Sequence, residues 1–155
     1  MQKKTVLVLF GGVSTEHEIS CVSAANVCEN INTEKYEIKK IGITKDGVWW
    51  MYDGCVSKMA DGSWLSDTEN LRPAILSPCS VHHGIAVFDK QKKTYSIERI
   101  DAVFPVLHGK NGEDGTMQGL IQLAGIPLVG CDTYSSAVCM NKAAAKLLAF
   151  SAGIE

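Results

Sequence analysis

The sequence predicts an α/β fold of the Rossmann-like kind, a parallel sheet flanked by helices, with an inserted β-hairpin region. The first reason is a continuous apolar run at residues 5–10, which ends in two glycines and leads into a helical pattern. The second is a strand pattern at residues 36–43, because strand, helix and strand in this order imply a right-handed crossover between parallel strands. The third is length, since 155 residues suffice for one enclosed core.

The first strand and helix are predicted in most detail. An uninterrupted apolar strand is typical of one that is covered on both faces. Thr15 and Glu18 have the spacing of a capping box, in which the N-cap hydroxyl and a later carboxylate satisfy backbone N–H groups. The helix is expected to run to about residue 31 and to bury apolar side chains at helical spacing, namely Ala24, Val27, Cys28 and Ile31.

The middle of the chain predicts short strands. Residues 46–54 indicate a strand approached through an Asp46-Gly47 turn, and residues 84–100 indicate a hairpin that turns near residues 90–93. Because these strands are short and partly polar, we expect an insertion or an edge layer outside the central sheet. Residues 53–83 show no pattern that assigns an element.

The final third returns to alternating strands and helices. A strand within residues 101–109 ends in His108-Gly109, and a helix starts near Asp114. A short strand is expected at residues 126–130. Two helices follow, at residues 134–141 and 142–152.

Charge and composition exclude several classes of partner. The net charge is −2, so no basic surface for nucleic acid or an acidic membrane is expected. Lys3 and Lys4 precede apolar residues as in a signal peptide, but the apolar run is too short and no cleavage site follows. No stretch approaches the ~20 apolar residues of a membrane span. We therefore expect a cytoplasmic protein.

The six cysteines are expected to be buried free thiols. No pair has C-x-x-C spacing, and no pair of cysteines at zinc-finger spacing accompanies His82 and His83. Cys21 and Cys28 would stand two turns apart on one helix, too far to bridge. Because a reducing cytoplasm keeps thiols free, neither a disulfide nor a metal site is expected.

Two loops are expected to meet at the carboxyl edge of the sheet, where open α/β sheets bind ligands. One strand leads into GGVSTEHE and the other into LHGKNGEDG, which brings Glu16 and His108 to the same edge. Glu16 stands at a helix N-terminus, where the dipole favours a carboxylate, so it serves either the helix or a ligand. Glu18 is interpreted as a capping residue, and Glu113 and Asp114 as caps of the next helix.

Two nucleotide-binding motifs do not fit. The dinucleotide pattern G-x-G-x-x-G is not formed, because Gly11 and Gly12 are adjacent and Thr15 follows. The phosphate-binding pattern G-x-x-x-x-G-K-[ST] does not occur either. The glycine turn is therefore interpreted as room for the close approach of a ligand.

Three stretches, in the right order and at compatible spacing, resemble the N-terminal domain of the D-alanine–D-alanine ligase family. They are FGGVSTEHEIS, VFPVLHGKNGEDGTMQGLIQLAGIPLVGCD and SSAVCMNKAAAK. The segment ENINTEKYEIKKIGITKDGVWW resembles longer ligases that include the vancomycin-resistance D-alanine–D-serine type. The resemblance implies that residues 1–155 are the N-terminal, substrate-binding α/β (pre-ATP-grasp) domain of a three-domain enzyme. Its ATP-grasp and C-terminal domains are absent from this chain.

The resemblance also implies an activity. Such an enzyme uses ATP and Mg²⁺ to activate one D-alanine as an acyl phosphate. It then joins this to D-alanine, D-serine or D-lactate for peptidoglycan precursor synthesis. Neither ATP nor Mg²⁺ is expected to bind this chain tightly by itself. A homodimer is implied too, with residues 117–126 supplying part of its surface. The alternative is a non-catalytic α/β module that retains the fold for binding or dimerisation.

Four site residues follow from matching the family's motifs. Glu16 matches the catalytic, substrate-binding glutamate that holds the ammonium of the first D-alanine. Ile19 matches the residue packed beside that substrate, and His108 belongs to the same subsite. Lys142 matches a lysine that reaches the nucleotide phosphates, although Asn141 stands before it where the family commonly has aspartate. No metal ligand is implied within this chain.

Overall fold

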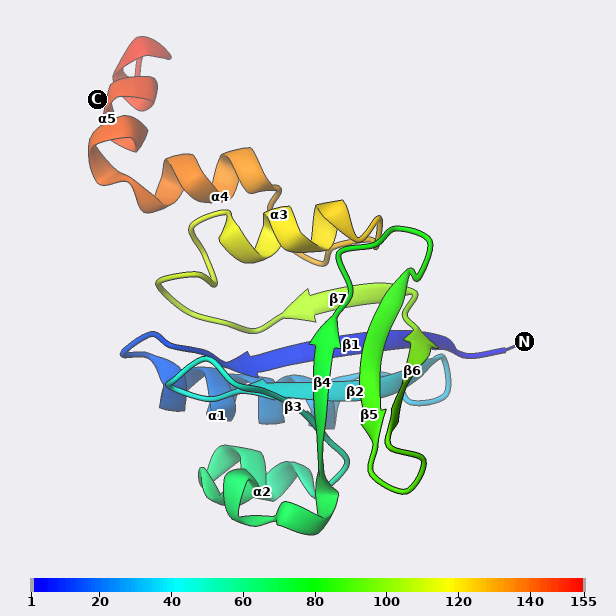
Figure 1. The fold of residues 1–155 in the computed structure, drawn as a ribbon. Coiled ribbons are helices and arrows are strands. Elements are labelled where there is room, and N and C mark those ends of the chain that lie inside the picture. Colours follow the sequence, from blue (N-terminus) through cyan, green and yellow to red (C-terminus); the bar gives the residue numbers. More distant parts are fainter. Residues whose placement is uncertain (1, 155) are drawn as a thin grey trace.

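A mixed seven-stranded sheet organises residues 2–154, the part of the chain that the computed structural model describes (Figure 1). The strand order is β6-β5-β4-β3-β2-β1-β7. The strands are β1 (Lys4–Gly11), β2 (Tyr36–Ile43), β3 (Trp49–Tyr52), β4 (Leu71–Leu76), β5 (Gly84–Asp89), β6 (Thr94–Arg99) and β7 (Ala102–Pro105). The helices are α1 (His17–Asn30), α2 (Val56–Ala60), α3 (Thr116–Leu123), α4 (Thr133–Met140) and α5 (Lys142–Ser151), with two 3-10 turns, η1 (Ser63–Ser66) and η2 (Thr68–Asn70).

The predicted α/β class is confirmed at the centre of the sheet. β1 pairs in parallel with β2 on one side and with β7 on the other, and α1 is the crossover between β1 and β2. From Val6 to Phe10, β1 is apolar and buried, because both its faces are covered there. Leu7 and Leu9 enter the core on one face, whereas Val8 and Phe10 enter the core on the other.

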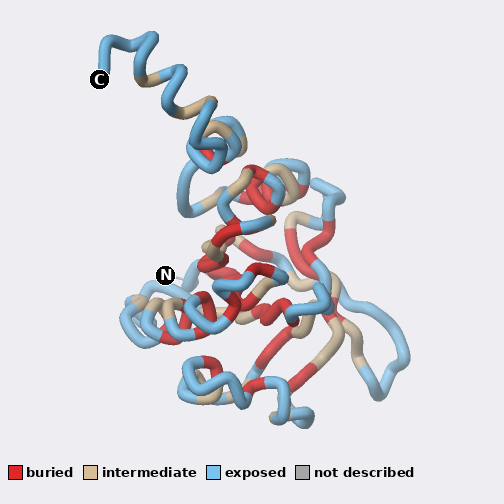
Figure 2. The backbone as a smooth tube through the Cα atoms, turned by 90° about the vertical axis from the view of Figure 1, so that its left-hand side faces the viewer, coloured by how far each residue is buried: buried red, intermediate tan, exposed pale blue. Residues whose placement is uncertain are grey.

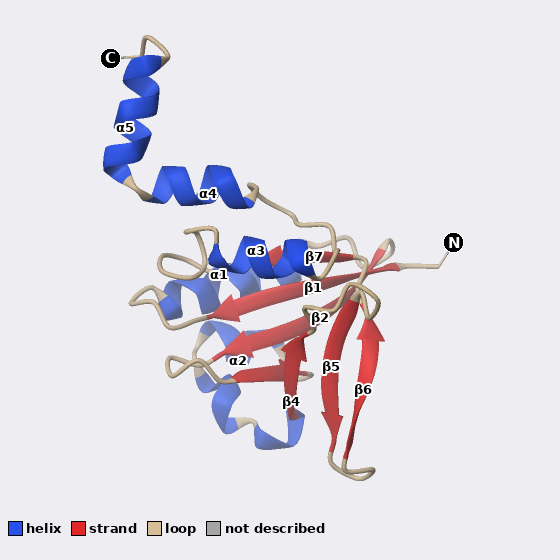
Figure 3. Ribbon diagram, turned by 45° about the horizontal axis from the view of Figure 1, so that its top comes forward, coloured by secondary structure: helices blue, strands red, loops and turns tan. Residues whose placement is uncertain are grey.

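The expectation that the middle strands lie outside the central sheet is wrong. β3 pairs antiparallel with β2, with Ile41 opposite Met51, and β4, β5 and β6 continue the same sheet outward. The predicted hairpin of β5 and β6 is confirmed. The sheet curls strongly, since Lys39 Nζ on β2 lies 2.7 Å from Glu98 Oε2 on β6, although three strands separate them in the sheet (Figure 3).

Two cores sandwich the sheet. One lies beneath α3, which contributes Met117 and Ile121, and the other beneath α1 and α2 (Figure 1). In α1 the predicted apolar stripe is confirmed, with Ala24 and Cys28 buried and Val27 and Ile31 partly buried. Residues 53–83, which the sequence left unassigned, form α2, η1, η2 and β4, and place the fully buried Trp64 in the second core.

The last third of the chain follows the prediction with three differences. α3 begins at Thr116 rather than near Asp114, and residues 126–130 form one bridge between Val103 and Leu128 instead of a strand. The predicted surface at residues 117–126 is wrong for most of its apolar side chains. Met117, Ile121 and Ile126 face the sheet, whereas Leu123 is 68% exposed.

α5 stands away from the rest of the structure. None of its residues is buried, and it projects beyond α4 at the end of the described chain (Figure 2). It follows α4 directly, and Asn141 separates the two helices (Figure 3). Contacts with the sheet therefore place α1 and α3, but not α5.

Two further sequence expectations concern thiols and membranes. All six cysteines are free, but only Cys21 and Cys28 are buried, so the expectation of burial is wrong for the other four. Burial raises the pKa of the Cys21 thiol to about 11. Across residues 2–154 no helix combines the length and the apolar character that a bilayer crossing requires.

Candidate functional site

The turn between β1 and α1 differs from the predicted capping box. α1 begins at His17, and no side chain caps it. Instead, Ser14 Oγ accepts the Glu16 N–H at 2.9 Å. Glu18 lies in the first turn of α1 and pairs with Lys45 in the β2–β3 turn, and the hydrogen bond from Lys45 lowers the pKa of the Glu18 carboxyl. The capping interpretation of Glu18 is therefore wrong, because a lysine brought close by the fold provides a charged partner.

Buried polar side chains fasten this turn to the sheet. Ser20 Oγ accepts the N–H of Gly11 at 2.8 Å and donates to the carbonyl of Val106, so one hydroxyl joins the ends of β1 and the β7 segment to α1. His17 is buried as well, with Nδ1 2.8 Å from the carbonyl oxygen of Gly12. These contacts fix the position of the first turn of α1.

The two predicted loops do meet at the carboxyl edge of the sheet. Gly109 has a φ of +66° and lies against Glu16. A β-carbon at Gly109 would stand 2.6 Å from Glu16 Oε2 and 2.8 Å from Ser14 Oγ, so only glycine allows this approach. Glu16 is exposed and takes part in none of the ion pairs found within residues 2–154. Its carboxylate is therefore available to a cation.

The loop that carries His108 is held at two points. Gly109 N–H donates to Glu113 Oε2 at 2.7 Å, and His108 Nε2 lies 3.3 Å from Ser23 Oγ on α1. Glu113 was expected to cap α3, but it binds this loop instead. Asp114 accepts the Thr116 N–H at 3.1 Å, one residue before the N-cap position of α3, which Gly115 occupies.

His108 lies between two hollows on the surface. The larger, of about 500 Å³, is bounded by the end of β7, α3 and α4, and includes Glu113 and Ser136 in its lining. The smaller, of about 250 Å³, faces the glycine turn at Gly11 and Gly12. A half-buried imidazole between two hollows is accessible to a small polar ligand from either side.

The remaining two predicted residues lie differently. Ile19 is on α1, three residues after Glu16, and is 59% exposed, so its side chain is accessible for apolar contact with a ligand. Lys142 is exposed at the first position of α5 and makes no hydrogen bond or ion pair with any residue in the described range. The structure thus brings Glu16, Ile19 and His108 to one edge but leaves Lys142 apart.

Asn141 acts as the cap of α5. Its side-chain oxygen accepts the N–H groups of Ala143 and Ala144, each at 3.1 Å. The departure from the family's common aspartate therefore preserves the capping function, because Asn and Asp are comparable N-caps.

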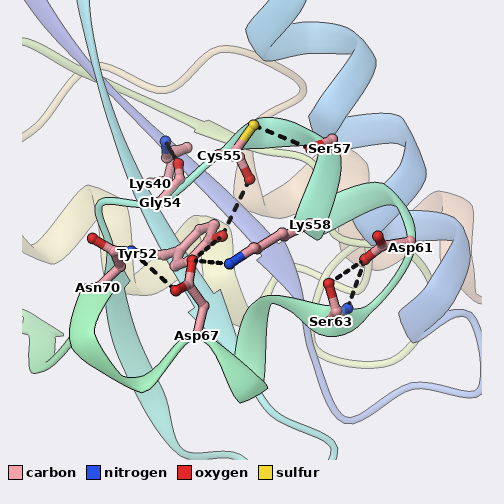
Figure 4. A network of polar contacts seen from close by, with 10 residues as sticks. All are labelled: Lys40, Tyr52, Gly54, Cys55, Ser57, Lys58, Asp61, Ser63, Asp67 and Asn70. Atoms are coloured by element: carbon pink, nitrogen blue, oxygen red, sulfur yellow. Dashed lines mark hydrogen bonds and ion pairs between the residues drawn. The ribbon is translucent and has the colours of Figure 1, made fainter.

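A second cluster of titratable side chains lies elsewhere, around Asp67 (Figure 4). The Asp67 carboxylate accepts Tyr52 O–H at 3.1 Å and Asn70 Nδ2 at 3.0 Å, and it pairs with Lys58 Nζ at 3.1 Å. The hydrogen bond from Lys58 lowers the pKa of Asp67, whereas burial raises that of Tyr52. Since both oxygens of Asp67 are engaged, this cluster ties β3 to η2 and offers no free charge.

A known protein family matches most of the chain. The family described as D-ala D-ala ligase N-terminus matches residues 5–131, a span that contains both loops of the edge. The chain belongs to the D-alanine–D-alanine ligase family. Its exposed glutamate and its LHG loop thus stand in the segment that defines the ligase N-terminal domain.

Individual ligases show the same relationship along nearly the whole chain. The D-alanine–D-alanine ligase of Caldicellulosiruptor bescii is 50% identical over 99% of this chain and 41% of its own length. The vancomycin/teicoplanin A-type resistance protein VanA of Enterococcus faecium is 48% identical over 99% of this chain and 42% of its own. This chain therefore spans about two fifths of these relatives.

A solved ligase structure confirms the fold. The VanG D-Ala:D-Ser ligase of Enterococcus faecalis superposes with a TM-score of 0.92 at 50% identity, over 99% of this chain and 43% of that one. The chain is thus as similar to a D-alanine–D-alanine ligase as to a D-Ala:D-Ser ligase.

Two polar residues of this edge, Ser20 and Ser23, were not singled out from the sequence. Ser20 holds the strand ends and Ser23 contacts His108. A signal did exist, since Ser20 and Ser23 follow Glu16 by four and seven residues and so share its side of α1. Serines at helical spacing are common, however, and only the contacts show what they do.

Proposed function

We propose that residues 1–155 are the N-terminal domain of an ATP-dependent D-alanine–D-X ligase of peptidoglycan precursor synthesis, and that they contribute the first D-alanine subsite. The observation that carries the proposal is the exposed, unpaired carboxylate of Glu16 against the His108–Gly109 loop. An ammonium group requires such a carboxylate, and a hydrogen bond to a charged group contributes about 1.5–3 kcal/mol.

The other residues have distinct roles in this proposal. Ile19 provides apolar contact next to Glu16, which suits the methyl group of alanine. His108 supplies a hydrogen-bonding ring at the same edge. Lys142 is an exposed cation at the start of α5, where the helix dipole also favours anions, and it fits nucleotide phosphates. ATP would supply the phosphoryl group that activates the D-alanine carboxylate.

Metal binding is assigned to the rest of the enzyme. Among residues 2–154 no three histidine, cysteine or acidic side chains are grouped closely enough to hold a metal ion. The residues described here therefore do not fit a Mg²⁺ site. We also propose that the enzyme is cytoplasmic and forms a homodimer.

The domain is compatible with more than one second substrate. The domain is 50% identical both to a D-alanine–D-alanine ligase and to a D-Ala:D-Ser ligase, so its sequence is compatible with either product. For the same reason its similarity to VanA does not separate a housekeeping enzyme from a resistance enzyme.

An assay of the complete protein tests the proposal. With ATP, Mg²⁺ and D-alanine, we expect phosphate release that depends on D-alanine, and a product containing D-alanine at its amino end by mass spectrometry. The 155-residue chain alone is expected to show no turnover and to bind D-alanine more weakly than about millimolar, since one charged contact barely offsets the entropy of capture. Absence of phosphate release from the complete protein with any D-amino acid or D-lactate would favour a non-catalytic module.

A further inference from the structure

His108 has a fixed backbone and one side-chain contact. Gly109 N–H is bound by Glu113, and the Gly109 carbonyl accepts the N–H groups of Gly112 and Glu113 at 3.1 and 2.9 Å. The preceding residue, Leu107, is buried. The imidazole can then move only by rotation about its own side-chain bonds. Within residues 2–154 its one hydrogen-bond contact is from Nε2 to Ser23 Oγ, at 3.3 Å.

Ser23 stands on the same side of α1 as the candidate ammonium ligand. Glu16 precedes it by seven residues, which corresponds to about two helical turns or roughly 10 Å along the axis. Gly109 lies against Glu16, whereas the ring of His108 reaches Ser23, so the loop runs along this side of the helix. Ile19 lies between the two ends and is exposed. A contact at Ser23 therefore orients the ring along the line that also contains Glu16 and Ile19.

We propose that Ser23 is a positioning residue that holds Nε2 of His108 and so orients the ring in the first D-alanine subsite. The inference rests on the proposed function. With Nε2 bound to the serine hydroxyl, Nδ1 is the ring nitrogen that remains for the substrate. The hydroxyl donates to one tautomer of the ring and accepts from the other, so the contact constrains orientation in both cases.

A merely structural role for Ser23 predicts that its replacement by alanine lowers the free energy of unfolding, whereas a positioning role does not. Serine has a lower helix propensity than alanine. Ser23 is half-buried, and its hydroxyl makes no other hydrogen bond among residues 2–154. Replacement by alanine is therefore expected to leave the free energy of unfolding unchanged or slightly higher. Replacement of Ser20 is expected to lower the free energy of unfolding, because its buried hydroxyl joins two strand ends.

Steady-state kinetics of the complete ligase provide the first test. Ser23→Ala is expected to raise KM for the first D-alanine by about 2–12-fold, the loss of one hydrogen bond, with kcat within about twofold of the parent. Ser23→Thr keeps a hydroxyl and is expected to restore KM. Ser57→Ala removes an exposed hydroxyl on α2 and serves as the matched control, with KM unchanged. An unchanged KM in Ser23→Ala, or an equal rise in Ser57→Ala, overturns the proposal.

A spectroscopic measurement separates this inference from the proposed function. ¹⁵N correlation spectra of the histidine-labelled complete protein, with His108 assigned by its loss in His108→Asn, report the state of each ring nitrogen. Ser23→Ala is expected to shift the signals of the His108 ring nitrogens and to leave those of His17, His82 and His83 in place. Unaltered His108 signals overturn the positioning role even if the protein is an active ligase. Altered signals in a protein without ligase activity overturn its place in a D-alanine subsite.

Discussion

The two halves of the sheet use polar side chains differently. In the parallel half, which comprises β2, β1 and β7 with α1 and α3, buried hydroxyls bind backbone groups of loops, as Ser20 does for Gly11 and Val106. In the antiparallel half, which comprises β3–β6 with α2, η1 and η2, charges bind one another. Arg72 lies 2.8 Å from Asp53 and 3.6 Å from Glu98.

The difference explains why the free carboxylate lies in the parallel half. The turn between β1 and α1 is held by the hydroxyls of Ser14 and Ser20, and Glu16 forms no ion pair within residues 2–154, so its carboxylate stays available to a ligand. In the antiparallel half, Asp67 is surrounded by Lys58, Tyr52 and Asn70 (Figure 4). Changes in the antiparallel half should therefore affect stability alone, whereas changes near Glu16 should affect substrate binding.

The largest effect is expected at Trp64, which belongs to the antiparallel half. It is fully buried and packs edge-on against Phe10, with ring centroids 4.9 Å apart, and against Tyr52 at 6.1 Å. Trp64→Ala is expected to lower the free energy of unfolding by about 3–5 kcal/mol, through lost burial and a cavity. Urea unfolding measures the loss. Trp64→Phe, which keeps an aromatic ring, should lose less.

Trp64→Ala also tests whether the antiparallel half affects substrate binding. The folded fraction of Trp64→Ala in the complete enzyme is expected to keep the parent KM for D-alanine. A large rise in KM would show that the core beneath α1 and the substrate edge are coupled, and would break the division between the halves.

The next effect concerns Glu16 in the parallel half. Glu16→Gln in the complete enzyme is expected to raise KM for the first D-alanine by about 10–150-fold, because the ammonium loses a charged partner. Glu18→Gln is the matched control, since Glu18 lies two residues away and pairs only with the exposed Lys45. Initial rates against D-alanine concentration measure both. Equal kinetic damage in the two variants would contradict the assignment of Glu16 as the substrate carboxylate.

A smaller effect, on stability, is expected at Ser20. Ser20→Ala leaves the N–H of Gly11 and the carbonyl of Val106 without their buried partner, and it should cost about 1–3 kcal/mol of unfolding free energy. Thermal and urea unfolding give the value. Ser23→Ala on the same helix is the control and should not destabilise the protein. If both serines cost the same, Ser20 does not have the special role in joining strands that its contacts indicate.

The smallest effect is expected at Asp101, where the two halves meet after β6. Its carboxylate accepts the Thr5 N–H at 2.8 Å and lies 3.4 Å from Lys4 Nζ. The backbone hydrogen bond from Thr5, followed by the charge of Lys4, lowers the pKa of Asp101 in the folded protein below its ordinary value of 3.8. Its contribution to stability is therefore present above that ordinary value and is lost as pH falls through the folded one.

A pH series tests this sign. Asp101→Asn should destabilise the protein by about 0.5 kcal/mol at neutral pH, a small value because the side chain is 36% exposed and solvent screens it. Between about pH 5 and pH 2 the stability of the variant should fall less steeply than that of the parent. Parallel curves for the two proteins would contradict the assignment.

The sequence predicted those parts of the protein that depend on local pattern. The apolar run of β1 and the helical pattern of α1 established the α/β class, because their periods follow from backbone geometry. The three motif stretches established the ligase family and pointed to Glu16 and His108, which the structure places at one edge. These features require only neighbours in the chain, or motifs long enough to be specific.

Tertiary contacts decided the rest. The capping box predicted for Glu18 depended on local spacing, but the Glu18 carboxylate pairs with Lys45 of another loop instead. Strands β3–β6 resembled a separate layer, yet pairing with β2 satisfies their backbone groups and extends one sheet. Ser23 shared only a common helical spacing with Glu16, and its contact with His108 joins residues 85 positions apart. Local periodicity determines which elements form, whereas long-range contacts determine which side chains remain free to act.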